Sequence, residues 1–217
     1  LKPKFSNILL ISSDLNETVE EISKIECENL IYLSQYEIFK KEFFKNRPYN
    51  IIFADFDNLP FKTKSFDLVI CNFCTNKVFE KKSYLQKLID ILTDDGLFLC
   101  NFFGEQTLNE LRQCFFIADE RFLNGTYNRI PKVDLMTNFS NLLAEVGYKE
   151  IVTEKINFEI FYKNIIGIFK DIKNMGEKLP IIENKEKVSK AYLKFLNSIY
   201  KKEFANKNSQ LKVTLDI

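Results

Sequence analysis

Short apolar runs alternate with helical patterns over the first hundred residues, and this alternation restricts the fold more than any other feature of the sequence. The runs are rich in Ile, Leu and Val and have the length of strands that are buried on both faces. Strands that alternate with helices predict a doubly wound, mainly parallel α/β sheet. We expect strands over residues 7–11, 30–33, 51–54, 66–71 and 97–103, and helices over residues 17–25, 36–45 and 84–92.

The second half of the chain is richer in helical patterns. A capping box of Thr107 and Glu110 predicts the start of one helix, and Gly147 predicts the end of another. Because no linker, repeat or low-complexity segment interrupts the chain, we expect a single domain over residues 1–217. The remaining helices are expected over residues 107–121, 135–145, 164–173 and 185–204, and further strands over 150–162 and 211–215.

Composition excludes several partners and locations. The 31 basic residues nearly balance the 30 acidic ones, so the basic excess of a nucleic-acid-binding protein is absent. No apolar run approaches the roughly 20 residues that a membrane span needs. The start, Leu1 to Phe5, is too polar for a signal peptide, so we expect a cytoplasmic protein, or one of an organellar matrix if a targeting segment precedes this chain. The five cysteines are then expected as reduced thiols in the interior.

Two residue types constrain the chemistry by their absence. The chain has no histidine, which excludes Ser-His-Asp and Cys-His nucleophile pairs and histidine metal sites. No glycine precedes Gly96, and no two glycines are close enough to form G-x-G. Phosphate-binding loops and dinucleotide fingerprints need such glycines, so kinases, NTPases and dehydrogenases are excluded.

Cys71 and Cys74 have the C-x-x-C spacing of some metal and redox sites. A zinc site would need two further ligands, and the sequence has no histidine and no second C-x-x-C. A redox pair usually opens a helix, whereas this pair closes a strand. Packing is therefore the preferred interpretation, and we predict no metal.

The stretch from Asp55 to Phe61, followed by residues 65–70 (SFDLVI), resembles the third and fourth strand ends of class I S-adenosylmethionine-dependent methyltransferases. The resemblance implies that Asp55 accepts a hydrogen bond from the adenine amino group and that Phe56 flanks the ring. Asn72, at the end of the fourth strand, is a further cofactor-binding candidate. The alternative for Asp55 is a loop residue that caps a neighbouring helix.

Residues 103–112 (FGEQTLNELR), 118–121 (ADER) and 171–177 (DIKNMGE) resemble one branch of that superfamily. The branch contains the malonyl-acyl carrier protein O-methyltransferase of biotin synthesis and the mitochondrial complex I assembly factor of methyltransferase fold. The similarity covers residues 50–217, about three-quarters of the chain, and does not separate the two members. It implies a Rossmann-like seven-stranded sheet with an antiparallel C-terminal strand, and an inserted helical cap around residues 105–146 and 163–204.

The first two strand ends depart from the family pattern. Glycines of the family's cofactor loop are replaced at Ser12 and Ser13, beside Asp14, and the family's ribose-binding acid is replaced at Ser34. A side chain in place of glycine blocks close approach of the backbone, and a neutral acceptor in place of a charged one forfeits about 1.5–3 kcal/mol per hydrogen bond. The resemblance implies S-adenosylmethionine as cofactor, and these departures predict weak or lost binding unless Asp14 or Glu37 compensates.

Two functions follow from the resemblance. One is O-methylation of a malonyl thioester on an acyl carrier protein, in which methyl transfer needs alignment of donor and acceptor rather than acid-base groups. The other is a non-catalytic or assembly-factor role with a protein partner, of which hydroxylase-like activity is a variant. Arg129, in the loop 128–131, is the best candidate to bind an anionic group of a substrate, and the alternative is an arginine that faces solvent.

Overall fold

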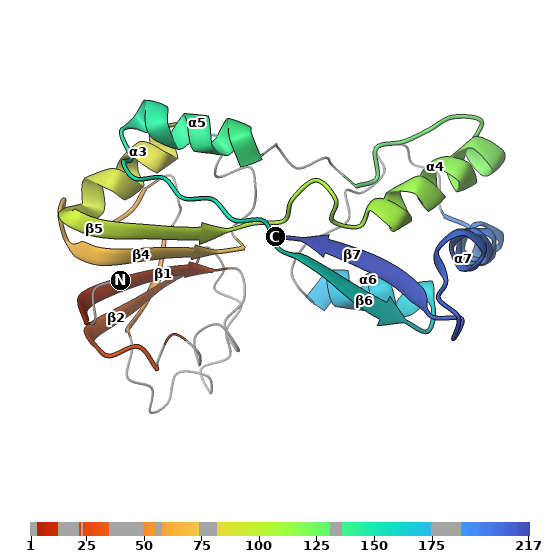
Figure 1. The fold of residues 1–217 in the computed structure, drawn as a ribbon, viewed down its shortest axis with the longest axis horizontal. Coiled ribbons are helices and arrows are strands. Elements are labelled where there is room, and N and C mark those ends of the chain that lie inside the picture. Colours follow the sequence, from red (N-terminus) through yellow and green to blue (C-terminus); the bar gives the residue numbers. More distant parts are fainter. Residues whose placement is uncertain are drawn as a thin grey trace. The chain divides into compact units, whose positions relative to one another are not determined.

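The computed structural model describes two compact units, and each is considered by itself (Figure 1). The first unit consists of Leu1–Phe102 and Met136–Thr153, and the second of Phe103–Leu135 and Glu154–Ile217. The expectation of one domain with inserted elements stays a prediction. The structure describes residues 4–12, 22, 24–34, 50–54, 58–73, 82–130, 136–174 and 188–217, without the side chains of Ser34 and Met136.

The first unit is built on a five-stranded sheet with the order β3-β2-β1-β4-β5. All four strand pairings are parallel, which confirms the predicted doubly wound α/β class. The strand order reverses between β1 and β4, and ligands of such sheets bind beyond the carboxyl ends of the strands at this point. The strands are β1 (Phe5–Ser12), β2 (Cys27–Ser34), β3 (Asn50–Phe53), β4 (Phe66–Asn72) and β5 (Leu92–Asn101).

The central strand β1 is buried on both faces, as its uninterrupted apolar run predicts. Leu9 and Ile11 pack in one cluster with Leu85 and Leu88 of α3 (Lys82–Ile91), and α5 (Met136–Val146) contributes to the same cluster. Ile8 and Leu10 of β1 pack in a second cluster on the opposite face of the sheet. Each buried aliphatic side chain stabilises the sheet by about 1.5–3 kcal/mol.

The prediction that Gly147 ends a helix is confirmed, and α5 stops one residue before it. Gly147 has φ +109°, a left-handed conformation that favours glycine. The strand expected over residues 97–103 is shifted toward the N-terminus, because β5 begins at Leu92, ends at Asn101 and includes residues 94–96. Phe66 pairs with Leu92 and then Leu68 with Leu97, so the extra residues form an irregularity within the strand.

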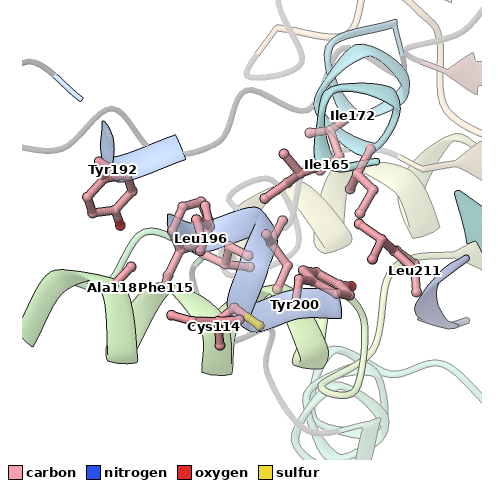
Figure 2. Packing of buried hydrophobic residues seen from close by; sticks show 14 residues of the cluster. Cys114, Phe115, Ala118, Ile165, Ile172, Tyr192, Leu196, Tyr200 and Leu211 are labelled. Carbon is pink, nitrogen blue, oxygen red and sulfur yellow. The ribbon is translucent and has the colours of Figure 1, made fainter. Parts of the chain in front are cut away.

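In the described residues of the second unit, a two-stranded antiparallel sheet is combined with three helices. Helices α4 and α7 pack together, and Cys114 and Phe115 of α4 lie in one apolar cluster with Leu196 and Tyr200 of α7 (Figure 2). The elements are α4 (Asn109–Leu123), β6 (Asn157–Tyr162), α6 (Ile165–Asn174), α7 (Lys190–Phe204) and β7 (Leu211–Asp216).

The expected single seven-stranded sheet is wrong, because the seven described strands lie in sheets of five and two. β7 is antiparallel as expected; among the described strands it pairs with β6, and its Leu211 also bridges Ala205. Its outer edge is occupied by the segment before α4. Gly104 N donates to the Asp216 carbonyl at 2.6 Å, and Leu108 N donates to the Thr214 carbonyl at 2.9 Å. These hydrogen bonds use groups that a further strand would need.

The expected capping box is also wrong, since Thr107 and Glu110 bind β7 instead of the helix. Thr107 Oγ1 donates to the Asp216 carbonyl at 2.8 Å and accepts from Asp216 N at 3.0 Å. The Glu110 carboxylate accepts from Thr214 N at 3.1 Å. Leu108 precedes α4 in a left-handed conformation and makes no side-chain cap. Both polar side chains therefore satisfy the outer edge of β7.

Candidate functional site

Polar side chains meet at the carboxyl edge of the five-stranded sheet. Ser12 of β1 is in register with Asn72 of β4, which is in register with Asn101 of β5. Ser12 and Asn72 are buried, with 2% and 9% of their surface exposed. The three residues mark the place where parallel α/β sheets bind ligands.

Hydrogen bonds fix the orientation of the two asparagines. Asn101 Nδ2 donates to Asn72 Oδ1 at 2.7 Å, and Phe73 N donates to Asn101 Oδ1 at 2.8 Å. Phe73 has φ 46°, so the chain turns sharply as it leaves β4. Tyr32 Oη donates to the carbonyl of Ser12 at 2.6 Å, which ties β2 to β1 at the same edge. Asn101 was not predicted as a site residue. A polar residue directly after the apolar run 97–100 could have indicated it.

The cofactor-binding residues predicted from the sequence are only partly described. Ser12 and Asn72 lie side by side at the sheet edge, and Ser34 ends β2, where it pairs with Phe53 of β3. Ser13, Asp14, Asp55 and Phe56 lie outside the described residues, so their roles stay predictions, as does cofactor binding by Ser12, Ser34 and Asn72.

The described part of this edge fits a polar ligand but offers neutral groups. Hydroxyl and amide side chains at Ser12, Asn72 and Asn101 suit a small molecule with hydroxyl and amine groups. Among the described strand-end residues of the five-stranded sheet, none is a carboxylate, and Ser34 stands where the resemblance predicts a ribose-binding acid. A neutral acceptor there predicts lower affinity for the ribose hydroxyls.

Arg129 lies in the second unit and is buried, with 5% of its surface exposed. Its Nε donates to both carboxylate oxygens of Asp119 at 2.8 Å, and its Nη2 forms an ion pair with the same group. The alternative of an arginine that faces solvent is therefore wrong. The anion that Arg129 binds in this structure is the carboxylate of Asp119, so its role toward a substrate stays a prediction.

Three aromatic rings surround this ion pair. The rings of Phe115, Tyr127 and Tyr192 have centroids 5.3, 5.6 and 5.2 Å from the guanidinium carbon of Arg129. Tyr192 Oη donates to Asp119 Oδ1 at 2.6 Å. Burial, and then the hydrogen bond to Asp119, raises the pKa of Tyr192 well above its ordinary value. We call Phe115, Asp119, Tyr127, Arg129 and Tyr192 the Asp119 cluster.

Asp119 was not among the predicted site residues, although it lies in the segment 118–121 that resembles the family. Leu111, Phe115 and Asp119 follow one another at intervals of four along α4, so the carboxylate lies on the apolar face of the helix. A buried carboxylate needs a partner, and a charge on an apolar stripe was therefore a signal of the ion pair.

Cys71 is fully buried in β4 and is in register with Cys100 of β5. Its burial agrees with the interpretation of Cys71 as a packing residue. Its C-x-x-C partner Cys74 lies outside the described residues. Within the described part of the chain, no group of three or more acidic or cysteine side chains is placed to hold a metal ion. The described helices include none that is long and apolar enough to cross a membrane.

Known proteins of the methyltransferase type are similar to this chain. A family described as "Methyltransferase domain" matches residues 13–100. The mitochondrial arginine-hydroxylase NDUFAF5 of Danio rerio is 25% identical over 170 residues, which cover 78% of this chain and 53% of that protein. The malonyl-[acyl-carrier protein] O-methyltransferase of Gallionella capsiferriformans is 28% identical over 123 residues, which cover 57% of this chain and 40% of that protein.

Among solved structures, the YcgJ protein of Bacillus subtilis aligns with a TM-score of 0.62 and 14% identity, over 99% of this chain and 89% of that one. At this identity the likeness establishes the fold alone. The chain spans about half the length of the curated relatives it matches.

Proposed function

We propose that this chain, which is of the class I S-adenosylmethionine-dependent methyltransferase type, works with a protein partner and binds its cofactor weakly. The role corresponds to the assembly-factor branch of the resemblance. The relatives named NDUFAF5 are arginine-hydroxylases, so an arginine side chain of the partner is the group we propose it recognises. An organellar matrix is the location we propose, because those relatives are mitochondrial.

One observation carries this choice: Arg129 is already paired with Asp119. A malonyl thioester carries a free carboxylate, which is the methyl acceptor, and Arg129 was the residue predicted to bind that group. Its guanidinium is buried against Asp119, so the malonyl function loses the anchor that the sequence predicted. The alignment with the arginine-hydroxylase also covers more of the chain than the alignment with the malonyl enzyme, 78% against 57%.

S-adenosylmethionine is the cofactor that this type of domain indicates. The cofactor supplies a methyl group on a sulfonium, which a well-aligned nucleophile can take with little acid-base assistance. Ser12, Asn72 and Asn101 would face it from the edge of the sheet, with the asparagine amides held in place by their mutual hydrogen bond. Neutral residues at Ser12 and Ser34 support a dissociation constant above ~100 µM.

The second candidate is O-methylation of a malonyl thioester on an acyl carrier protein. The ordered pair Asn72 and Asn101 favours it, because a fixed polar edge is what an active cofactor site requires. In that case the protein would act in biotin synthesis and would be expected in the cytoplasm.

The two candidates give opposite results in cells that make this protein. We expect that its removal lowers the amount of assembled respiratory complex I on a native gel and leaves growth without biotin unchanged. Loss of growth without biotin, with complex I intact, would transfer the proposal to the malonyl candidate. Incubation of the purified chain with malonyl-acyl carrier protein and methyl-labelled cofactor should give no labelled ester.

A further inference from the structure

The side chains of the Asp119 cluster come from two kinds of element, helices and a connecting segment. Phe115 and Asp119 lie on α4 and Tyr192 lies on α7, so helices that pack together hold these three side chains. Figure 2 shows Phe115 and Tyr192 on these two facing helices. Arg129 instead lies on the connecting segment 124–130, which follows α4 and has no helix or strand of its own.

The chemistry of the three side chains on the helices matches a guanidinium group. A carboxylate accepts two parallel hydrogen bonds from a guanidinium fork, and aromatic faces attract the delocalised cation. Asp119 is fully buried and Tyr192 is 2% exposed, so these interactions act away from water. The Tyr192 hydroxyl adds a hydrogen bond that orients the carboxylate. Such a site favours arginine over lysine, because an ammonium group lacks the planar fork.

We infer that Phe115, Asp119 and Tyr192 form a binding site for the guanidinium group of an arginine side chain of a partner protein, and that Arg129 fills this site in the free chain. The inference rests on the proposed partner-binding function and names the structural element that performs it. Arg129 then acts as an internal competitor whose displacement makes the site available.

Exchange of one guanidinium for another keeps the buried carboxylate paired. It therefore avoids the destabilisation that follows when a buried ion pair loses one member. The competitor is tethered, and a short tether gives it an effective concentration in the millimolar range. Only chains whose site is open can bind the peptide, and the apparent dissociation constant is inversely proportional to the fraction of such chains. The wild-type chain therefore binds a free arginine peptide weakly.

The segment that carries Arg129 is held at its far end and exposed along the rest. Asn124, Thr126 and Asn128 are exposed and contribute little apolar burial, whereas Ile130 is buried in the apolar cluster and fixes the end of the segment. A backbone hydrogen bond from Arg129 N to the Tyr127 carbonyl, 2.9 Å long, is internal to the segment and can move with it.

The test measures binding of a fluorescent pentapeptide, acetyl-Ala-Ala-Arg-Ala-Ala-amide, by anisotropy. We expect Arg129→Gln to bind it at least tenfold more tightly than the wild-type chain, because the internal competitor is gone. Addition of Asp119→Asn to that variant should abolish the gain, and the corresponding lysine peptide should show no gain. Arg121→Gln is the matched control, since Arg121 is an exposed arginine of α4 that stacks on Phe195.

A gain of affinity in Arg129→Gln shows that the vacated site accepts a guanidinium, and hydrogen exchange of the wild-type chain shows whether a partner's arginine displaces Arg129. A folded Arg129→Gln chain that binds no more tightly than wild type would overturn the proposal, as would an equal gain for the lysine peptide. Circular dichroism checks the fold of each variant.

Hydrogen exchange of the wild-type chain decides the question even if Arg129→Gln does not fold. Saturating arginine peptide should speed exchange over residues 124–130, because displaced Arg129 releases the segment, and unchanged exchange there would refute the inference. The outcomes separate from those of the proposed function. A complex I defect without any peptide effect refutes only the guanidinium site, and a peptide effect without that defect refutes only the assembly role.

Discussion

The carboxyl edge of the five-stranded sheet and the Asp119 cluster solve the same problem, the placement of buried polar groups, in opposite ways. At the sheet edge, Asn72 and Asn101 are neutral and neighbours in strand register. In the second unit, Asp119 and Arg129 are charged and come from a helix and a loop, with Tyr192 73 positions away from Asp119. Neutral polar groups can be buried at a small energetic cost when strand register makes them neighbours. A buried charge needs a partner for each of its hydrogen bonds, and Asp119 obtains its partners from a loop and from a second helix.

The largest effect is expected where the charges are buried. Asp119→Asn keeps the shape of the side chain but leaves the Arg129 guanidinium without its counter-charge, which should lower the free energy of unfolding by about 3–5 kcal/mol. Urea denaturation measures the loss. Glu120→Gln, at the exposed neighbouring position, should change stability by less than about 0.5 kcal/mol. Similar losses in the two variants would show that the ion pair adds nothing specific.

The neutral sheet edge should respond in affinity rather than stability. Ser12→Gly, Ser13→Gly and Ser34→Asp together restore the family's glycines and acid, and should tighten binding of S-adenosylhomocysteine by roughly a hundredfold, about 2.7 kcal/mol. Isothermal titration calorimetry measures the gain, once folding has been checked, because each glycine costs about 0.5–1 kcal/mol. Because the three substitutions lie at one site, their effects on the binding free energy should not be additive.

Asp55→Ala in the restored chain is the control, because the resemblance gives Asp55 the adenine contact. It should remove the gain. A wild-type dissociation constant in the low micromolar range would instead show that other groups replace the missing ones, and the prediction of weak binding would be abandoned.

A smaller effect is expected where a neutral hydroxyl holds the outer edge of β7. Thr107→Val keeps the shape but removes the two hydrogen bonds with the backbone of Asp216, at a cost of about 1–3 kcal/mol. Amide exchange at Asp216 should accelerate more than exchange at the centre of β1. Thr126→Val, at an exposed loop position, is the matched control. Unchanged exchange at Asp216 would mean that Gly104 and its neighbours alone protect the edge.

The smallest effect concerns pH. Burial, and then the hydrogen bond to Asp171, raises the pKa of Tyr162 to about 12. The folded state holds this proton more tightly than the unfolded chain, whose tyrosine pKa is about 10. The contribution to stability is therefore complete below pH 10 and is lost as the pH rises toward 12. Tyr162→Phe should make the alkaline loss of stability slightly shallower, and identical pH profiles would contradict this.

The parallel strands could be predicted because their evidence is local. Runs such as Ile8 to Ile11 have no polar side, so a strand covered on both faces is the arrangement that leaves no apolar face exposed. Gly147 likewise ended its helix as expected, since a left-handed residue is a local requirement. Thr107 and Glu110 misled the prediction because the same side chains can cap a helix or bind a strand edge. A strand more than one hundred residues away in sequence took them.

Local sequence patterns were enough to predict the fold class, the parallel strands and the polar strand ends at Ser12 and Asn72. All of these follow from hydrophobic periodicity and from residues close together along the chain. The tertiary structure alone decided that β7 pairs with β6 in a separate sheet and that Arg129 meets Asp119 in an aromatic setting. Both outcomes depend on which of several groups satisfies a buried hydrogen-bonding partner, and spacing along the chain does not record that competition.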